Sequence, residues 1–290
     1  MPIEENYKTY EQKIKTKKIK NTLIVVLLLL PVLVLILFPY FIMLSTSLRT
    51  LQECVVFPPK WFPSKIIWRN YIDIFQKIPL GRFFSNSFLV GIGATFICLI
   101  SALPAAFILV RYRLRFRSAI LFLILITQFI APAIMIIALF KMVLRIKLMD
   151  THLALIITDA AFFLPFSTWL LLGFLKTVPG SIFEAATIDG ASDIRTMYKI
   201  ALPIIKPGLI TAIIFTFIEV WNEFLFALIF LTSYKKRVLT IGIFAFSARN
   251  KFQWNYLLAA ALLSAIPVII LFLLLQKYLI KGLTAGAIKE

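Results

Sequence analysis

Six apolar stretches of about 20 residues or more dominate this 290-residue chain. A helix of that length crosses the roughly 30 Å hydrocarbon core of a bilayer, where every backbone polar group must be bonded within the protein. With 61% hydrophobic and 15% charged residues, the chain is too apolar for a soluble domain. The sequence therefore predicts an all-α, polytopic membrane protein with six transmembrane helices at residues 21–44, 85–110, 118–140, 152–175, 205–232 and 257–280.

Basic residues beside the span ends indicate the orientation. The stretch "KIKTKKIK" precedes the first span, and the tight loop Arg111–Arg117 follows the second. Because Lys and Arg accumulate on the cytoplasmic side of a membrane, both termini of this multi-pass protein of the inner, cytoplasmic membrane are expected in the cytoplasm. The expected organisation is a basic cytoplasmic segment at 1–20, a transmembrane domain at 21–280 with an inner loop at 179–203, and a cytoplasmic tail at 281–290.

The charge and the reactive residues exclude several function classes. The net charge of +18 fits basic residues beside lipid headgroups, and no nucleic-acid-binding motif accompanies it. Cys54 and Cys98 make neither a disulfide framework nor a metal pair, and His152 is expected to be interfacial. There is no HExxH or GxSxG constellation. The sequence thus predicts no enzyme, no bound metal and no cofactor held by this chain.

The stretch "EAATIDGASDIRTMYKIALP" (Glu184–Pro203) forms a polar loop between the fourth and fifth spans. After the turn at Pro179-Gly180, Ser181 and Glu184 have the spacing of a capping box, which predicts a short helix through "IFEAATI". Gly190 suits a left-handed helix end, and a second helix is expected to begin near Ser192 or Asp193 and to stop before Pro203. The pattern predicts helix, glycine corner, helix.

Two interpretations of this loop differ in what it contacts. An amphipathic helix lying on anionic lipid needs basic residues opposite large apolar ones, whereas "EAATIDGA" is acidic and rich in small residues. Ala185, Ala186 and Ala191 allow another backbone to approach closely. This composition favours a protein-docking surface over a lipid-bound helix.

The loop resembles the EAA loop of bacterial ABC-importer permeases. The residues that carry the resemblance are Glu184, Ala185, Ala186, Gly190, Ile200, Leu202 and Pro203. The stretches "MLSTSLRT", "MDTHLAL", "WNEFLFALIFL" and "KGLTAGAIKE" extend it over nearly the whole chain and are similar to the second, MalG-like permease subunit of carbohydrate importers, the binding-protein-dependent inner membrane components.

The resemblance implies a set of partners. These are a related first permease subunit as heterodimer partner, a dimer of ATPase subunits inside, and an extracytoplasmic solute-binding protein. None of the ten glycines is followed by Lys, so the chain has no GxxxxGK[ST] phosphate loop, and ATP and Mg are expected on the partner ATPase subunits. In the family that the loop resembles, the first short helix of the EAA loop is the coupling helix, which seats in the ATPase subunit. The resemblance therefore implies ATPase docking by Glu184, Ala185, Ala186, Asp189 and Gly190. It also implies that the tail contacts the ATPase through Leu283, Thr284, Ala285 and Gly286.

Polar residues within the apolar spans indicate a substrate path or a gate. Glu219, Asn222 and Glu223 stand at helical spacing and are expected on one face of the fifth span, together with Thr216 and Phe226. Asp159 stands in the fourth span near Phe162, Phe163 and Phe166. Intramembrane carboxylates usually face a bundle interior or water. They can bond sugar hydroxyls, or they can hold the helices in place by pairing with Lys or Arg. Both roles stay open for Glu219 and Glu223.

Alternative functions remain at this stage. A permease of the same superfamily for a non-sugar solute, such as a glycerophosphate or a polyamine, would carry the same loop. An ion-coupled secondary transporter or channel would also use intramembrane acids and kinked helices, but it needs no ATPase dock. Helix kinks are expected in four spans, at Pro104, Pro132, Pro165 and Pro267.

Overall fold

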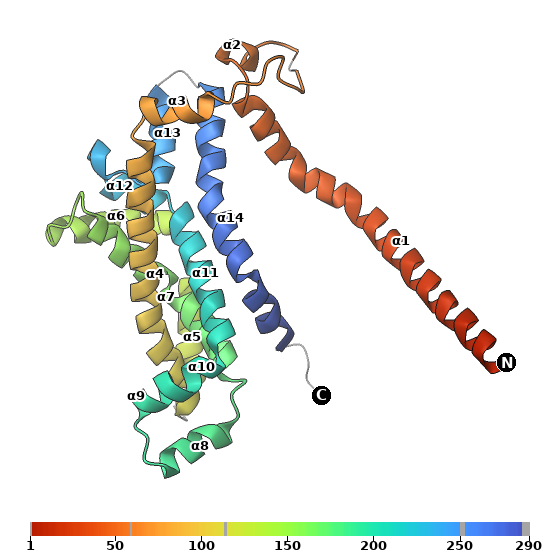
Figure 1. Ribbon diagram of the computed structural model, residues 1–290. Helices are drawn as coiled ribbons and strands as arrows, with labels where there is room; N and C mark the ends of the chain where they lie inside the picture. The colour runs from red at the N-terminus through yellow and green to blue at the C-terminus, as the bar shows by residue number, and fades with distance from the viewer. Residues whose placement is uncertain (1, 59, 113–114, 250–252, 286–290) are drawn as a thin grey trace. The chain divides into compact units, whose positions relative to one another are not determined.

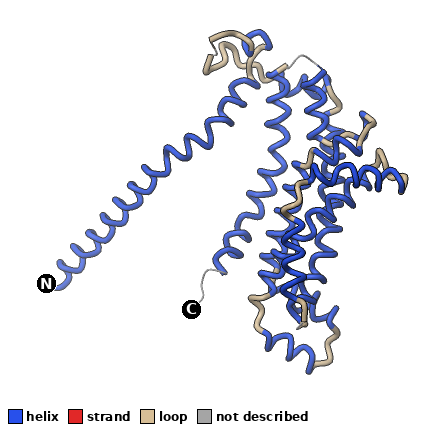
Figure 2. The backbone as a smooth tube through the Cα atoms, turned by 180° about the vertical axis from the view of Figure 1, so that it is seen from behind, coloured by secondary structure: helices blue, strands red, loops and turns tan. Residues whose placement is uncertain are grey.

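The computed structural model describes the whole chain except residues 1, 59, 113–114, 250–252 and 286–290, and this described part contains helices and loops but no strand (Figures 1 and 2). The helices are α1 (Pro2–Ser47), α2 (Leu51–Cys54), α3 (Asn70–Lys77), α4 (Leu80–Arg111), α5 (Arg117–Thr127), α6 (Pro132–Arg145), α7 (His152–Leu175), α8 (Gly180–Ile188), α9 (Asp193–Thr196), the π-helix η1 (Met197–Ala201), α10 (Leu202–Ile204), α11 (Lys206–Asn222), α12 (Leu225–Phe230), the 3₁₀ helix η2 (Tyr234–Lys236), α13 (Leu239–Arg249) and α14 (Trp254–Ala285). The prediction of an all-α protein is confirmed.

Four helices are long and apolar enough to cross a bilayer, namely Val25–Ser47 within α1, α4, α7, and Trp254–Lys277 within α14. A fifth crossing is possible where Asp193–Ile204 and Lys206–Asn222 meet at a bend of 85°. Helix α7 begins and ends where the span 152–175 was predicted. The predicted spans 118–140 and 205–232 are each interrupted, so neither is one continuous helix.

The interruption near residue 130 has a local cause. Ala131 is extended, with ψ of 132°, and Pro132 is the first residue of α6. Proline disfavours helical backbone in the residue before it, so the helix that ends at Thr127 cannot continue directly into α6. By contrast, Pro104, Pro165 and Pro267 lie inside α4, α7 and α14 without ending them. Of the four prolines at which kinks were expected, only Pro132 lies at a break between two separate helices.

The chain divides into two compact units, Met1–Ile72 with Gln253–Leu262, and Asp73–Phe252 with Leu263–Glu290. In the first unit, buried Asn70 organises the loop after α1: its Nδ2 donates to the carbonyl oxygens of Ser47 (2.8 Å) and Arg49 (2.9 Å). Arg49 Nη2 donates to Ser45 Oγ at 2.7 Å. The two Asn70 bonds satisfy carbonyl groups at and just after the end of α1.

The second unit is built on α4 and α7, which pack along each other, with α11 against both (Figure 1). Its core has one apolar cluster around Val90, Leu155 and Phe226, and another around Leu103, Leu171 and Ile205. Gly208 allows α11 to approach α7 closely, because a Cβ at this position would overlap the ring of Phe174. Helices α4, α7 and α11 thus form the packed core of the second unit, and its polar loops connect to this core.

Candidate functional site

The segment after α7 begins with α8, which differs from the expected helix at its start. Pro179 is the N-cap and makes no side-chain cap bond, and α8 already includes Gly180. The predicted capping box of Ser181 and Glu184 is therefore wrong, because Ser181 lies inside the helix and Glu184 in its second turn. Proline without an N–H suits a helix start, where that donor would have no partner.

The predicted glycine corner is present at Gly190, whose φ is +72°. Gly190 N donates to Thr187 O at 3.1 Å, and Ala191 N donates to Ala186 O at 2.9 Å. This pair of bonds is the Schellman motif, which closes a helix through a left-handed residue, usually glycine. Ser192 then caps α9 by accepting a bond from Arg195 N at 3.3 Å.

The second helix of the loop was predicted to stop before Pro203, and this prediction is wrong. It runs from α9 through the π-helix η1 and includes Pro203 in α10, ending at Ile204. Pro203 is the second residue of α10, directly after the π-helix η1. The bend of 85° into α11 follows directly, so the segment turns sharply at the foot of the bundle.

One face of the α8–α10 segment packs on the helix bundle. Phe183 and Ala186 of α8 and Met197 of η1 are buried, and the Phe183 ring meets that of Phe107 edge-on at 5.9 Å between centroids. Phe107 belongs to α4, so α8 is seated directly on a membrane-length helix. Ala186, predicted as a docking residue, lies on this inner face.

Polar contacts also join the segment to the end of α4. Arg111 Nη2 donates to Thr187 Oγ1 at 2.6 Å, and Arg111 Nε lies 3.7 Å from Asp193 Oδ1. Tyr112 donates its hydroxyl to the Asp193 carboxylate. The end of α4 is therefore bonded through side chains to both α8 and α9.

The opposite face of the segment is open. Glu184, Ala185, Asp189 and Gly190 are exposed, and Ile188 is 86% exposed. Four of the five predicted docking residues thus share a face that the rest of the described chain leaves uncovered. This exposed face therefore combines one large apolar side chain with small residues, two carboxylates and a backbone corner.

Glu223 does not lie on the face of α11, contrary to the prediction. Helix α11 ends at Asn222, and Glu223 has extended backbone with ψ of 133°. Its two carboxylate oxygens accept bonds from Phe226 N at 2.7 Å and Ala227 N at 2.9 Å. Glu223 therefore caps α12, and a carboxylate suits a helix N-terminus. At the break between α11 and α12, this side chain satisfies two backbone donors of α12.

The other predicted path residues lie in different environments. Asp159 is 0% exposed, and neither of its carboxylate oxygens has a hydrogen-bond partner in the described structure. Glu219 is half-buried on α11, and exposed Asn222 donates back to Ile218 O at 2.9 Å. Within the described residues, no hydrogen bond joins Asp159, Glu219, Asn222 and Glu223 to one another.

A chain of hydroxyl and thiol groups joins the three central helices. Cys98 Sγ on α4 donates to Ser167 Oγ on α7 at 3.4 Å, and Ser167 Oγ lies 2.9 Å from Thr216 Oγ1 on α11. Small polar residues bond in this way across helices in membranes. The sequence interpretation placed Thr216 with the path residues and missed this link, although small polar residues in three apolar spans were the available signal.

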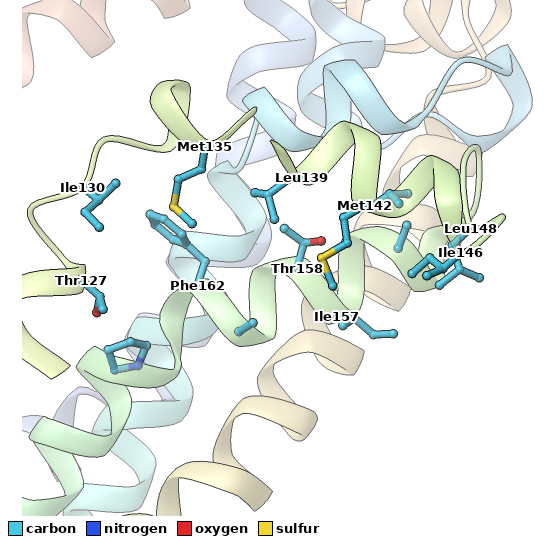
Figure 3. A pocket seen from close by; sticks show the side chains of 14 residues that line it. Thr127, Ile130, Met135, Leu139, Met142, Ile146, Leu148, Ile157, Thr158 and Phe162 are labelled. Carbon is cyan, nitrogen blue, oxygen red and sulfur yellow. The ribbon is translucent and has the colours of Figure 1, made fainter. Parts of the chain in front are cut away.

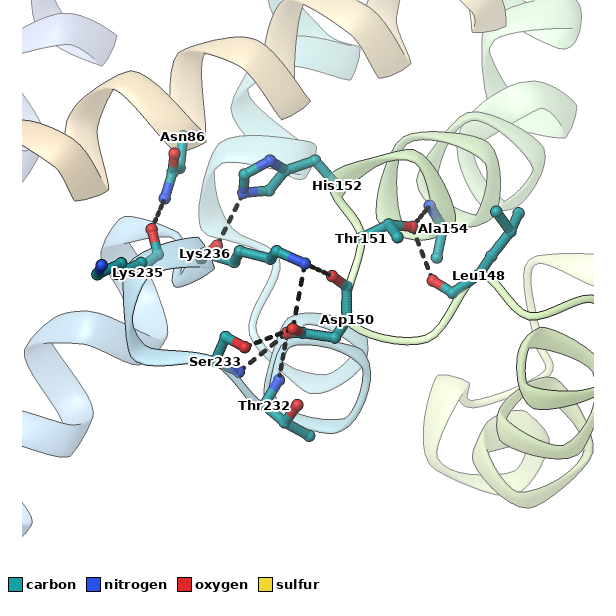
Figure 4. A network of polar contacts seen from close by, with 10 residues as sticks. All are labelled: Asn86, Leu148, Asp150, Thr151, His152, Ala154, Thr232, Ser233, Lys235 and Lys236. Carbon is teal, nitrogen blue, oxygen red and sulfur yellow. Dashed lines mark hydrogen bonds and ion pairs between the residues drawn. The ribbon is translucent and has the colours of Figure 1, made fainter.

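A second polar cluster, which we call the Asp150 cluster, lies where the loop before α7 meets the loop after α12 (Figure 4). Asp150 Oδ1 accepts from Thr232 N at 3.1 Å and Ser233 N at 2.9 Å, and its other oxygen lies 3.2 Å from Lys236 Nζ. His152 Nε2 lies 2.8 Å from Lys236 O, so the single histidine has a structural contact. The sequence interpretation missed the cluster because its two parts, the loop before α7 and the loop after α12, are more than 80 residues apart in sequence.

The Asp150 cluster makes the stability of the folded protein depend on pH. Burial would raise the pKa of Asp150, but the hydrogen bonds from Ser233 and Lys236 outweigh it and lower the pKa from 3.8 to about 2. The stabilisation is therefore complete above about pH 4 and is lost as the pH falls toward 2. In Asp150→Asn we expect the melting temperature of the purified protein to fall by roughly 2–6 °C at pH 7.

The measurement is a melting curve at pH values from 7 to 3. The difference between wild type and Asp150→Asn should stay constant down to about pH 4.5 and shrink below pH 4. Lys235→Gln is the matched control, because this neighbouring cation extends away from the cluster in Figure 4. A difference that grows on acidification would contradict the assigned role.

A largely apolar cavity of about 300 Å³ lies between α6 and α7 (Figure 3). Met135, Leu139 and Met142 line one side, Ile157 and Phe162 the other, and Thr127 and Thr158 supply hydroxyl groups. A sugar needs several converging hydrogen-bond partners, so this cavity suits an apolar chain better than a sugar.

The predicted tail contact falls at the end of α14 and beyond it. Leu283, Thr284 and Ala285 lie at the end of α14, with their side chains outside the described part, and Gly286 lies outside the described residues.

Known proteins resemble this chain in sequence and in fold. A family model described as "Binding-protein-dependent transport system inner membrane component" matches residues 99–285. The sulfoquinovosyl glycerol transport system permease protein SmoH of Agrobacterium fabrum is 34% identical over 253 residues, covering 87% of this chain and 89% of that protein. The melibiose/raffinose/stachyose import permease protein MelC of Bacillus subtilis is 32% identical over 254 residues, covering 87% and 91%.

A solved structure has the same fold. It is described as a bacterial ABC transporter involved in the import of the acidic polysaccharide alginate, and one of its chains superposes with a TM-score of 0.74 at 23% identity. The superposition covers 88% of this chain and 95% of that chain. The helical breaks described above therefore occur on a fold that is known among membrane transporters.

Proposed function

This chain belongs to the family of binding-protein-dependent transport system inner membrane components, and from that premise we propose that it forms half of the translocation path of an ATP-driven carbohydrate importer. It is a permease subunit and not an enzyme. Relatives are named for sulfoquinovosyl glycerol, for melibiose, raffinose and stachyose, and for diacetylchitobiose. Because all of these are carbohydrates or glycosides, a sugar is favoured over a glycerophosphate or a polyamine.

The coupling segment is residues 179–203, and its exposed face is the ATPase dock. The observation that carries this proposal is the Gly190 corner, which presents Glu184, Ala185 and Asp189 outward while Phe183 anchors α8 on α4. A rigid connection of this kind can transmit a movement of an attached subunit to the helix bundle. Ala186 supports the dock from its inner face.

The partners follow from the same function. We infer a heterodimer with a related first permease subunit, a pair of ATPase subunits that hold ATP and Mg, and an extracytoplasmic solute-binding protein. A solved structure described as an alginate ABC transporter in complex with a pentasaccharide-bound periplasmic protein has this fold, with a TM-score of 0.65. The tail residues Leu283, Thr284, Ala285 and Gly286 are proposed to contact the ATPase subunits.

The proposed topology has six crossings with both termini in the cytoplasm. They are formed by α1, α4, α5 with α6, α7, α11 with α12, and α14, so two of the six are broken helices. Residues 1–20 and 281–290 are then cytoplasmic, and residues 21–280 form the permease domain in the inner membrane. Broken helices suit a transporter, because irregular backbone at membrane depth is tolerated where it lines a path.

Glu219, Asn222 and Glu223 are assigned to the gate at the break between α11 and α12. Glu223 maintains the break by capping α12, and Thr240 Oγ1 donates to its carbonyl oxygen at 2.8 Å. A solute path beside this break would move when α11 and α12 change their angle. The test of the whole proposal is uptake that requires ATP, the ATPase subunits and the binding protein.

Asp159 is assigned to the path, in a state of the transporter that opens α7. A buried carboxylate without partners destabilises the closed arrangement, so we expect Asp159→Leu to raise the melting temperature of the assembled complex by roughly 2 °C or more. Sugar uptake should fall at least fivefold, because the opened path loses a hydrogen-bonding group worth about 1.5–3 kcal/mol.

Melting and initial uptake rates, measured on the same preparations, separate the two effects. Ser167→Ala is a useful comparison, because it removes a bonded polar group on the same helix and should lower the melting temperature instead. If Asp159→Leu takes up the sugar at the wild-type rate, Asp159 is not part of the solute path.

A further inference from the structure

A second hollow of the molecule differs from the apolar cavity in both size and lining. It is an open groove of about 780 Å³ on α12, α13 and the loop between them, and we call it the outer groove. Its lining residues are Leu228, Leu231, Thr232, Tyr234, Arg237, Ile241, Phe244 and Ala245. The lining combines two aromatic rings, one cation and two hydroxyl groups, and it includes no carboxylate.

The aromatic rings of the outer groove are held in place and remain accessible. Tyr234, 42% exposed, meets the fully buried ring of Phe83 edge-on at 5.5 Å between centroids. Phe244, 50% exposed, meets Phe224 edge-on at 5.2 Å. Fixed aromatic faces cover the apolar side of a sugar ring without losing much conformational entropy on binding.

Arg237 is the only cation among the residues that line the outer groove. Its guanidinium carbon lies 5.2 Å from the centre of the Tyr234 ring, a contact that uses the face of the guanidinium group. Its N–H donors point along the plane of that group, and no bond from them occurs within the described structure. The backbone is fixed, because Asn86 Nδ2 donates to Arg237 O at 2.8 Å.

Neighbouring charge does not neutralise Arg237. Asp150, an acid distant in sequence that bonds to the loop preceding Arg237, already accepts bonds from Thr232 N, Ser233 and Lys236 (Figure 4). Guanidinium binds carboxylates and other planar or branched anions through two parallel bonds. A cation with available donors beside two aromatic faces is therefore suited to an acidic sugar unit.

We propose that the outer groove is a subsite that selects sugars carrying an anionic group, with Arg237 binding the anion and Tyr234 and Phe244 packing on the ring. The proposal rests on the carbohydrate import function argued above and adds the charge class of the sugar and the residues that read it. Thr232 and the Tyr234 hydroxyl supply further bonds to ring hydroxyl groups.

Weak sugar binding to the assembled complex, without the binding protein, tests this subsite directly. The complex is placed in phosphatidylcholine nanodiscs, which offer Arg237 no net anionic lipid, and saturation-transfer NMR is recorded with two matched probes, α-1,4-digalacturonate and neutral α-1,4-galactobiose. In wild type the acidic probe should give at least a fivefold larger signal. In Arg237→Gln the two probes should agree within twofold.

Two further variants keep the result interpretable. Arg237→Lys keeps the charge but loses the fork of donors, so it should retain less than half of the wild-type preference, and it serves as the test if Arg237→Gln does not assemble. Lys235→Gln should keep the wild-type preference, because its side chain is not part of the groove. Equal signals for both probes in wild type, or a wild-type preference in both Arg237 variants, would overturn the proposal.

A second readout distinguishes failure of the proposed subsite from failure of the proposed import function. ATP hydrolysis stimulated by the solute-binding protein is recorded on the same nanodiscs. Stimulated hydrolysis without any preference for the acidic probe overturns only the subsite. Absence of stimulation in wild type counts against the importer itself.

Discussion

Gly190→Asp is expected to reach the membrane in normal amount and yet to lose at least nine-tenths of its sugar uptake. Gly190 has φ of +72°, a conformation that costs residues with a side chain about 1–2 kcal/mol. A Cβ added there would meet no atom of the described residues within 4 Å. Strain at the corner is therefore modest, and the larger effect should come from pushing the ATPase surface away from α8.

A graded set of variants separates strain from obstruction. Asparagine adopts the left-handed conformation more readily than other residues with a side chain. Any loss of uptake in Gly190→Asn therefore reports mainly that the added side chain displaces the ATPase surface. Gly180→Asp is the matched control, because Gly180 starts the same helix, has open space around it and does not require positive φ. We expect this control to keep more than half of wild-type uptake.

The measurements are co-purification of the ATPase subunits and initial uptake rates in membranes with equal permease content. Gly190→Asp should lose both together. Normal uptake by Gly190→Asp would show that the exposed face of α8 is not the dock.

The sequence was most informative where a local rule determines the structure. The Gly190 corner and the Ser192 cap follow from short-range backbone chemistry, and α7 follows from an uninterrupted apolar run. The start of α8 was predicted wrongly because two signals competed there. Pro179 and Ser181 can both begin a helix, and the chain uses the first.

Breaks inside apolar runs were harder to predict. Pro132 was recognised as an interruption, but its consequence, two separate helices, depends on the extended backbone of Ala131. Glu223 looked like a residue on a helix face because spacing alone assumes that the helix continues. The carboxylate instead satisfies backbone donors of α12, and only the folded chain decides between these two roles.

Contacts between distant segments could not be predicted at all. Asp150 and Lys236 belong to different loops, and nothing in either stretch indicates the other. The outer groove likewise combines residues from α12, α13 and their loop with support from Phe83 on α4. Such sites arise from the packing of the helices and leave no periodic signal in the sequence.

The second large effect expected is complete dependence of transport on the ATPase partner. The chain lacks a phosphate-binding glycine loop, and its family is defined by dependence on a binding protein. The exposed face of α8 is the route by which we propose that ATP hydrolysis acts on the helices. Without the ATPase subunits, the two states of the permease would have no energy source to drive a cycle.

Reconstitution of the purified complex into sealed proteoliposomes tests this account most directly. The proteoliposomes hold the two permease subunits with or without the ATPase pair, and receive the solute-binding protein together with the labelled sugar that it binds most tightly. Accumulation of the sugar should require the ATPase pair, ATP and the binding protein, and should fall at least a hundredfold when any one is omitted. Accumulation by the permease subunits alone, driven by a proton or sodium gradient and indifferent to ATP, would contradict it.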